Sequence, residues 1–141
     1  MATRTSTASW EGDLMKGKGS MRLGSGAFEG PFSFPSRFED GSGTNPEELI
    51  GAAHAGCFSM AFSLILGDAG YTPTRIDTSA KVHLDKVGEG FQITRIELDT
   101  KAQVPNLEDA EFQQLANKAK EGCPVSQALA GPKISLTAQL A

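Results

Sequence analysis

The chain has 141 residues, a mass of 14.9 kDa, a formal charge of −4 and an isoelectric point near 5.1. A chain of this length can bury roughly two thirds of its unfolded surface, so we predict a single domain over residues 1–141 that needs no structural disulfide. Its 13 lysines and arginines are scattered along the sequence, which excludes the basic stripe typical of nucleic-acid-binding proteins.

The longest apolar stretch, residues 49–66, predicts a buried helix and no membrane partner. Glycine, histidine and serine interrupt this stretch at Gly51, His54, Gly56, Ser59 and Ser63, which makes it too polar for a membrane span. The first twenty residues contain charged side chains and no long apolar run, so no signal peptide is expected. We therefore expect a cytoplasmic protein, in a compartment that keeps most thiols reduced.

The N-terminal part of the chain predicts short strands followed by a loop. Two or three strands are expected from residue 2 to residue 22, with Trp10 as an apolar anchor. Residues 24–44 are rich in glycine and proline, which predicts a loop. The same stretch has four phenylalanines, so this loop is expected to pack against another part of the protein.

The first helix is predicted from residue 45 to about residue 66. Asn45 suits the N-cap, Pro46 the first helical position and Glu48 the capping box. Apolar residues occur on nearly all sides, which is typical of a helix buried in a core or between subunits. Because one small sheet and one shorter helix offer too little cover, we expect a homodimer that buries this helix.

The second half of the chain predicts a hairpin, two helices and a last strand. Residues 74–85 and 91–103 alternate with period two, with one slip in the second run, and residues 88–90 close them into a hairpin. Residues 107–121 have helical spacing and Gly122 ends that helix. A short helix is expected at 124–129 and a strand at 134–140. This order predicts an α+β fold with antiparallel sheet.

Cys57 and Cys123 are the only cysteines, and a dithiol–disulfide pair is the main functional hypothesis. A cysteine in an apolar helix is more often an inert core residue, and a cysteine in a turn often has no role. His54, however, lies one turn from Cys57 on the same face, and Cys123 begins a short helix, where a thiolate is favoured. The pair can form a bond only if the Cα atoms come within about 7 Å.

A reactive thiol also needs a cation, and Arg37 is the candidate because it precedes the long helix in the phenylalanine-rich loop. A guanidinium group stabilises a thiolate and can orient a peroxide oxygen. Without further support, an arginine in an exposed loop is more often solvated than functional.

Three blocks of the sequence resemble the signature blocks of the OsmC and Ohr superfamily of thiol-dependent organic hydroperoxide reductases. They are residues 44–49 (TNPEEL), 53–58 (AHAGCF) and 122–126 (GCPVS). Matches at 10–12, 37–39 and 84–87 extend the resemblance over nearly the whole chain and favour the osmotically inducible protein C (OsmC) branch. The resemblance implies an intertwined homodimer of α+β subunits, with antiparallel sheets, a long central helix and two active sites at the interface.

By motif position, the resemblance implies that Cys57 is the peroxidatic thiol, Cys123 the resolving thiol, Arg37 the activating cation and Glu47 its carboxylate partner. The arginine of the Ohr branch lies nearer the N-terminus, so Arg22 and Arg4 remain alternatives. Glu47 lies ten residues before Cys57, which is about 15 Å along a continuous helix. Either the helix breaks near Gly51 or Glu47 reaches the thiol of the other subunit.

The resemblance implies a reaction that consumes an organic hydroperoxide, as part of a defence against oxidative and osmotic stress. The Cys57 thiolate forms a sulfenic acid, Cys123 converts it to a disulfide, and an external dithiol, for example of the lipoyl type, reduces that bond. This chemistry needs neither a metal nor another cofactor. An apolar pocket is expected from Phe28, Phe32, Phe34, Phe38 and Phe58, of which Phe34, Phe38 and Phe58 are the predicted substrate-binding residues.

Three alternatives remain open from the sequence. A redox sensor or binding protein would use the same thiol pair without useful turnover. A metal site built from His54, Cys57 and Cys123, with His83 or water as fourth ligand, fits no standard zinc spacing. A hydrolase using Cys57 with His54 would need an oxyanion hole, for which no motif is recognisable.

Overall fold

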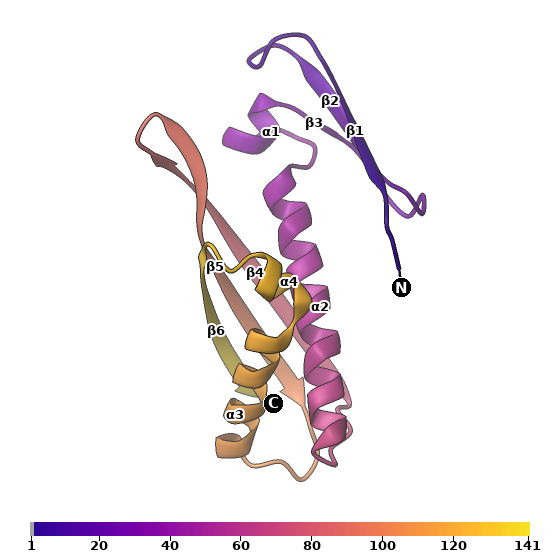
Figure 1. Cartoon of the computed structure of the whole chain (residues 1–141), viewed down its shortest axis with the longest axis vertical. Coiled ribbons are helices and arrows are strands. Elements are labelled where there is room, and N and C mark those ends of the chain that lie inside the picture. The colour runs from indigo at the N-terminus through magenta and orange to yellow at the C-terminus, as the bar shows by residue number, and fades with distance from the viewer. Residues whose placement is uncertain (1) are drawn as a thin grey trace. The chain divides into compact units, whose positions relative to one another are not determined.

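The computed structural model describes residues 2–141, and the chain divides into two compact units, Met1–Leu49 and Ile50–Ala141 (Figure 1). One helix, α2 (Pro46–Asp68), continues from the first unit into the second. The single domain expected from the chain length stays a prediction.

The first unit contains a three-stranded antiparallel sheet in the order β1 (Ser6–Glu11), β2 (Lys18–Leu23) and β3 (Glu29–Phe32), followed by the short helix α1 (Phe34–Phe38). The prediction of strands before residue 22 is confirmed, but the prediction of a loop throughout residues 24–44 is wrong. Pro31 is tolerated in β3 because β3 is an edge strand. Helix α1 begins at a capping box in which Ser33 and Ser36 exchange side-chain to backbone hydrogen bonds.

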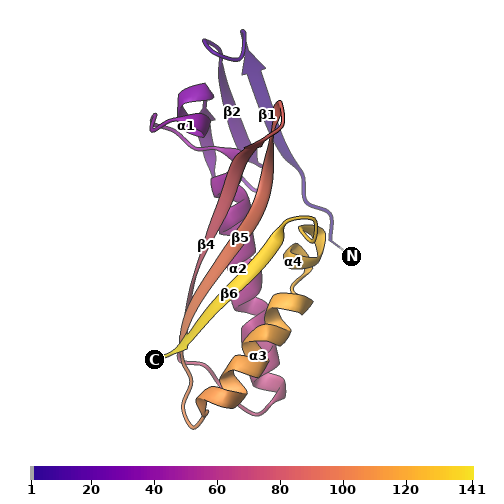
Figure 2. The same ribbon diagram turned by 90° about the vertical axis from the view of Figure 1, so that its left-hand side faces the viewer.

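The second unit contains a three-stranded sheet in the order β4 (Arg75–Val87), β5 (Gly90–Gln103) and β6 (Lys133–Leu140). The antiparallel hairpin β4–β5 is confirmed. So is the slip in its second strand: His83 pairs with Arg95, but the next residue, Leu84, pairs with Ile93. The predicted antiparallel sheet is present in this hairpin, and strand β6 adds to it as a parallel neighbour of β5. The crossover that a parallel pair requires is made by α3 (Asp109–Gly122) and α4 (Pro124–Ala128), and Figure 2 shows β6 beside β5.

The core of the second unit lies between helix α2 and the sheet. Phe58, Phe62 and Leu66 follow one face of α2 and are fully buried. The ring of Phe62 lies 5.6 Å from that of Phe58 and 5.4 Å from that of Phe112 on α3. Such ring pairs add to the free energy gained by burying apolar area.

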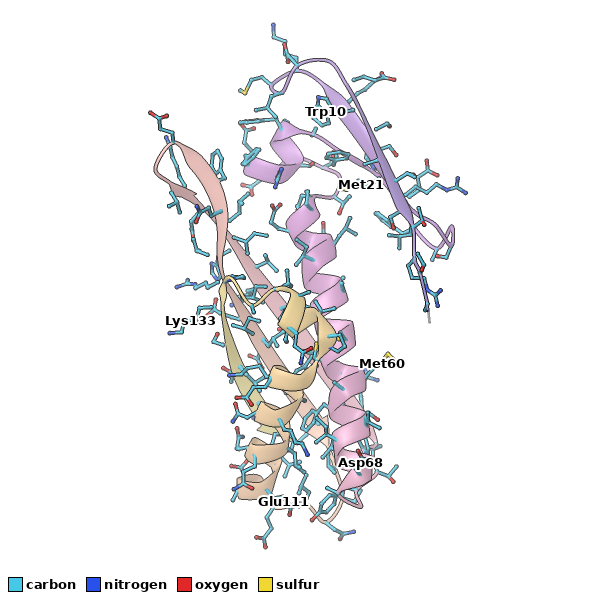
Figure 3. All side chains as sticks on the ribbon, in the orientation of Figure 1. Trp10, Met21, Met60, Asp68, Glu111 and Lys133 are labelled. Carbon is cyan, nitrogen blue, oxygen red and sulfur yellow. The ribbon has the colours of Figure 1, made fainter. Side chains whose placement is uncertain are left out.

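The other face of α2 carries large apolar side chains that the single chain leaves uncovered. Met60 is 78% exposed and Leu64 is 65% exposed. Figure 3 shows Met60 pointing away from the sheet of the second unit. By length and composition α2 could cross a membrane, so the expectation that this stretch is too polar to do so is wrong. In the structure its Phe58, Phe62 and Leu66 face packs in the core of the second unit.

Candidate active site

The fold brings the two cysteines together, although they are 66 residues apart in sequence. Their Sγ atoms are 2.8 Å apart, and both residues are free cysteines. A disulfide bond measures about 2.05 Å, so a relative movement of about 0.8 Å closes the pair. The cysteine pair can therefore exist either as a dithiol or as a disulfide.

Each cysteine is held by an element that the sequence predicted. Cys57 lies on α2 next to the buried Phe58, which fixes the rotation of the helix. Cys123 is the residue between α3 and α4: its N–H donates to the Ala119 carbonyl, 3.0 Å, and its carbonyl accepts from Gln127 N–H, 3.1 Å. Its Sγ also accepts from Ser126 N–H, 3.4 Å. The backbone of Cys123 is thus fixed on both sides.

The surroundings of the two thiols favour ionisation of Cys123 over that of Cys57. Burial raises the pKa of Cys57, and the neighbouring Cys123 raises it further. Burial also opposes ionisation of Cys123, but hydrogen bonds from Cys57 and Ser126 outweigh it and lower the pKa of Cys123. Among the residues that the structure describes, no cation contributes to the pKa shift of Cys57. A peroxidatic role for Cys57 therefore requires a cation from elsewhere.

His54 lies on the buried face of α2, one turn before Cys57. It is fully buried, and its Nε2 is 2.7 Å from Ser126 Oγ. Burial lowers the pKa of His54, so the imidazole is neutral at neutral pH. Ser126 was not predicted as a site residue, although it is the last residue of the signature block 122–126.

Arg37 and Glu47 form an ion pair within the first unit. Arg37 Nη2 lies 2.7 Å from Glu47 Oε1, and Nε lies 3.2 and 3.3 Å from the two carboxylate oxygens. Glu47 is buried, which limits screening of this pair by water. Ser36 holds α1 in place by donating from Oγ to the Thr44 carbonyl, 2.7 Å. The arrangement presents a fixed guanidinium; its activating role stays a prediction.

An apolar pocket of about 300 Å³ lies beside Arg37 in the first unit. It is lined by Trp10, Leu14, Phe32, Ser33, Phe34, Arg37 and Phe38. Figure 3 marks Trp10, whose ring centroid is 5.3 Å from that of Phe32. The Arg37 guanidinium lies 5.4 Å from the centroid of the Phe38 ring, a cation–π contact that further orients it.

Not every predicted site residue lies at this pocket. The structure brings Phe34 and Phe38 together there, with ring centroids 4.9 Å apart. Phe58 is instead 0% exposed in the core of the second unit, so its ring offers no surface to a ligand in the single chain. Phe58 lies on the buried face of α2. The sequence did not identify that face, because apolar residues occur on nearly all sides of the helix.

The structure also bears on the alternative arginines and on the hypothesis of a metal site. Arg22 lies 4.0 Å from the exposed Glu29, and Arg4 donates to the Thr3 carbonyl. Across residues 2–141, no group of three His, Cys, Asp or Glu side chains is arranged to hold a metal ion. His83 contacts Glu97 on the neighbouring strand.

Comparison with known proteins places this geometry in a family. The sequence profile of the OsmC-like protein family matches residues 39–137. Peroxiredoxin OsmC of Escherichia coli (strain K12) is 55% identical over 134 residues, which cover 94% of this chain and 93% of the relative. An organic hydroperoxide resistance protein of Xanthomonas axonopodis pv. citri (strain 306) is 34% identical over 102 residues, 72% of this chain and 69% of the relative.

The fold is also similar to that of a solved structure. The crystal structure of an organic hydroperoxide resistance protein from Elizabethkingia anophelis has a TM-score of 0.80 and 26% identity, and the match covers 100% of this chain and 98% of that one. The α+β fold class is confirmed, and the 55% identity to an OsmC protein supports the predicted branch. The chain belongs to the OsmC-like protein family.

Proposed function

We propose that this protein is a thiol-dependent peroxidase that reduces organic hydroperoxides to alcohols, in defence against oxidative and osmotic stress. The observation that carries the proposal is the 2.8 Å separation of Cys57 Sγ and Cys123 Sγ. The names of the relatives, a peroxiredoxin and organic hydroperoxide resistance proteins, support the same reaction class.

The reaction has two steps at sulfur and a third that restores the enzyme. The Cys57 thiolate attacks the terminal peroxide oxygen; the O–O bond breaks, Cys57 becomes a sulfenic acid, and the departing alkoxide takes a proton to leave as the alcohol. Cys123 then attacks the Cys57 sulfur, which forms the disulfide and releases the sulfenic oxygen as water. An external dithiol, for example of the lipoyl type, reduces the disulfide and is itself oxidised.

For activation of Cys57, we propose Arg37 and Glu47 of a second copy in a homodimer. Helix α2 has no break at Gly51, and the ten residues from Glu47 to Cys57 correspond to about 15 Å of helix. The first of the two alternatives drawn from the sequence, a broken helix, is therefore excluded. The exposed Met60 and Leu64 offer apolar surface for such a dimer.

The substrate class follows from the pocket beside Arg37. Its wall is mainly aromatic and suits an alkyl chain, while the guanidinium can donate to the peroxide oxygens. We therefore propose Phe34 and Phe38 as substrate-binding residues and a preference for alkyl or lipid hydroperoxides over hydrogen peroxide. We also propose that the protein acts in the cytoplasm without a cofactor.

Steady-state consumption of cumene hydroperoxide with excess dithiol tests the proposal. Wild type should turn over, Cys57→Ser should be inactive, and Cys123→Ser should consume one equivalent and then stop at the sulfenic acid. Sustained turnover by Cys123→Ser would show that Cys123 is not required. Turnover by Cys57→Ser would overturn the proposal. A wild type that is oxidised once, forms the disulfide and is not recycled would favour the redox-sensor alternative.

A further inference from the structure

His54 is a buried titratable group that the reaction above does not use. Its Nε2 is 2.7 Å from Ser126 Oγ. Within residues 2–141, its Nδ1 is the one buried side-chain nitrogen or oxygen without a hydrogen-bond partner. The side chain therefore makes a single polar contact, and that contact leads towards Cys123.

The unpartnered nitrogen decides which tautomer is favoured. A proton on Nδ1 would leave a buried N–H donor without an acceptor, whereas a proton on Nε2 leaves only a lone pair unpaired. Buried N–H groups are left unpaired less often than buried acceptors. The favoured neutral His54 therefore carries its proton on Nε2 and donates it to Ser126 Oγ.

A hydrogen bond from His54 fixes the role of the Ser126 hydroxyl. Since its oxygen accepts from His54, the hydroxyl proton is available to a second acceptor. Cys123 Sγ is close by: it accepts from Ser126 N–H at 3.4 Å, and the Ser126 side chain also lowers the pKa of Cys123. Ser126 thus lies between His54 and the resolving sulfur: its hydroxyl oxygen contacts His54 and its N–H donates to Cys123 Sγ.

We propose that His54 is a positioning residue for the resolving step, which directs the Ser126 hydroxyl proton to Cys123 Sγ and holds that sulfur as a thiolate facing Cys57. This inference rests on the proposed peroxidase function. In that step the thiolate forms the S–S bond, the S–O bond of the Cys57 sulfenic acid breaks, and the departing hydroxide takes up the proton lost by Cys123. His54 acts through Ser126 and contacts neither sulfur in the reaction.

Two substitutions of His54 distinguish the effect of its hydrogen-bond donor from the effect of its side-chain volume. His54→Gln retains an N–H donor close to the position of Nε2, whereas His54→Leu fills similar volume without one. Rapid-mixing experiments with one equivalent of cumene hydroperoxide would follow sulfenic acid at Cys57 and then the disulfide. We expect His54→Leu to slow disulfide formation about 10-fold, the effect of losing about 1.4 kcal/mol of stabilisation, and His54→Gln to restore most of the rate.

A second readout reports directly on Cys123. In the Cys57→Ser background, the ultraviolet absorbance of the Cys123 thiolate can be followed against pH. Adding His54→Leu should shift its midpoint to higher pH, and His54→Gln should shift it less. The charged side chains that line the surface beside Ser126, Lys120 and Glu121, are the same in every variant.

The outcomes separate this inference from the function on which it rests. If wild-type Cys57 forms no sulfenic acid, the peroxidase function fails. If sulfenic acid forms and both His54 variants make the disulfide at the wild-type rate, or Gln is as slow as Leu, the inference is overturned. Should His54→Leu not fold, Ser126→Ala against Ser126→Thr gives the same contrast, because only Thr keeps the hydroxyl.

Discussion

Oxidation of Cys57 and Cys123 to a disulfide should raise the free energy of unfolding by about 4 kcal/mol. The two residues are 66 positions apart, and a crosslink over such a loop removes conformational entropy from the unfolded chain. In the chain-entropy model the gain lies between the values of about 3 kcal/mol for a 15-residue loop and about 4.7 kcal/mol for a 100-residue loop. Because the sulfurs already lie 2.8 Å apart, little native distortion offsets this gain.

Denaturant unfolding of the reduced and the oxidised protein at one protein concentration measures the difference. A fixed concentration is needed because a homodimer has a concentration-dependent stability. Free energies extrapolated to water should be compared instead of midpoints, because the crosslink makes the unfolded state more compact and lowers the m-value. Cys57→Ser is the matched control and should show no dependence on oxidant.

An oxidised protein that is no more stable than the reduced one would refute this reasoning. It would mean that the bond distorts the native structure as much as it constrains the unfolded chain. A gain of similar size in Cys57→Ser would instead point to an effect of the oxidant unrelated to the pair.

Three further predictions concern the core, the ion pair and pH. Phe62→Ala should lower the free energy of unfolding by about 3–5 kcal/mol, because the ring is fully buried. The control Phe91→Ala, at a side chain that is 55% exposed, should lower it less; denaturant unfolding measures both. Glu47→Gln should reduce peroxide turnover by roughly 10- to 100-fold by loosening Arg37, with unchanged far-ultraviolet circular dichroism; an unaffected rate would contradict the pair's role. The folded pKa of His54 is lowered below 6.5 by burial, so below pH 6.5 the unfolded chain binds more protons. The free energy of unfolding should therefore fall as pH drops below about 6.5, by up to about 1.4 kcal/mol per pH unit, and it should fall less steeply in His54→Gln. Equal dependence on pH in the two proteins would show that His54 is not the group responsible.

Local signals in the sequence predicted most elements because each signal acts over a few residues. Asn45 does cap α2, accepting from Glu48 N–H at 2.8 Å. Glu48, however, accepts from the Thr44 hydroxyl instead of completing a capping box. The missed helix α1 has its own capping box, formed by two serines, which is a weaker signal than a serine with a glutamate.

Pairings between distant residues could not be predicted from local patterns. The parallel register of β6 with β5 depends on where α3 and α4 return the chain. The polar contact of His54 with Ser126 spans 72 residues, and no period or cap encodes it. Phe58 was assigned to a pocket because its type is suitable, whereas its burial depends on which face of α2 meets the sheet.

The sequence by itself determined most of the elements, the two candidate thiols and the family, since short motifs and side-chain periodicity specify these. Only the tertiary structure decided that Cys57 and Cys123 come within bonding reach, and that Ser126 connects His54 to the second thiol. The physical reason is that contact between segments 66 or more residues apart is fixed by the packing of α2 and α3 on a common core, to which no single segment contributes enough buried surface.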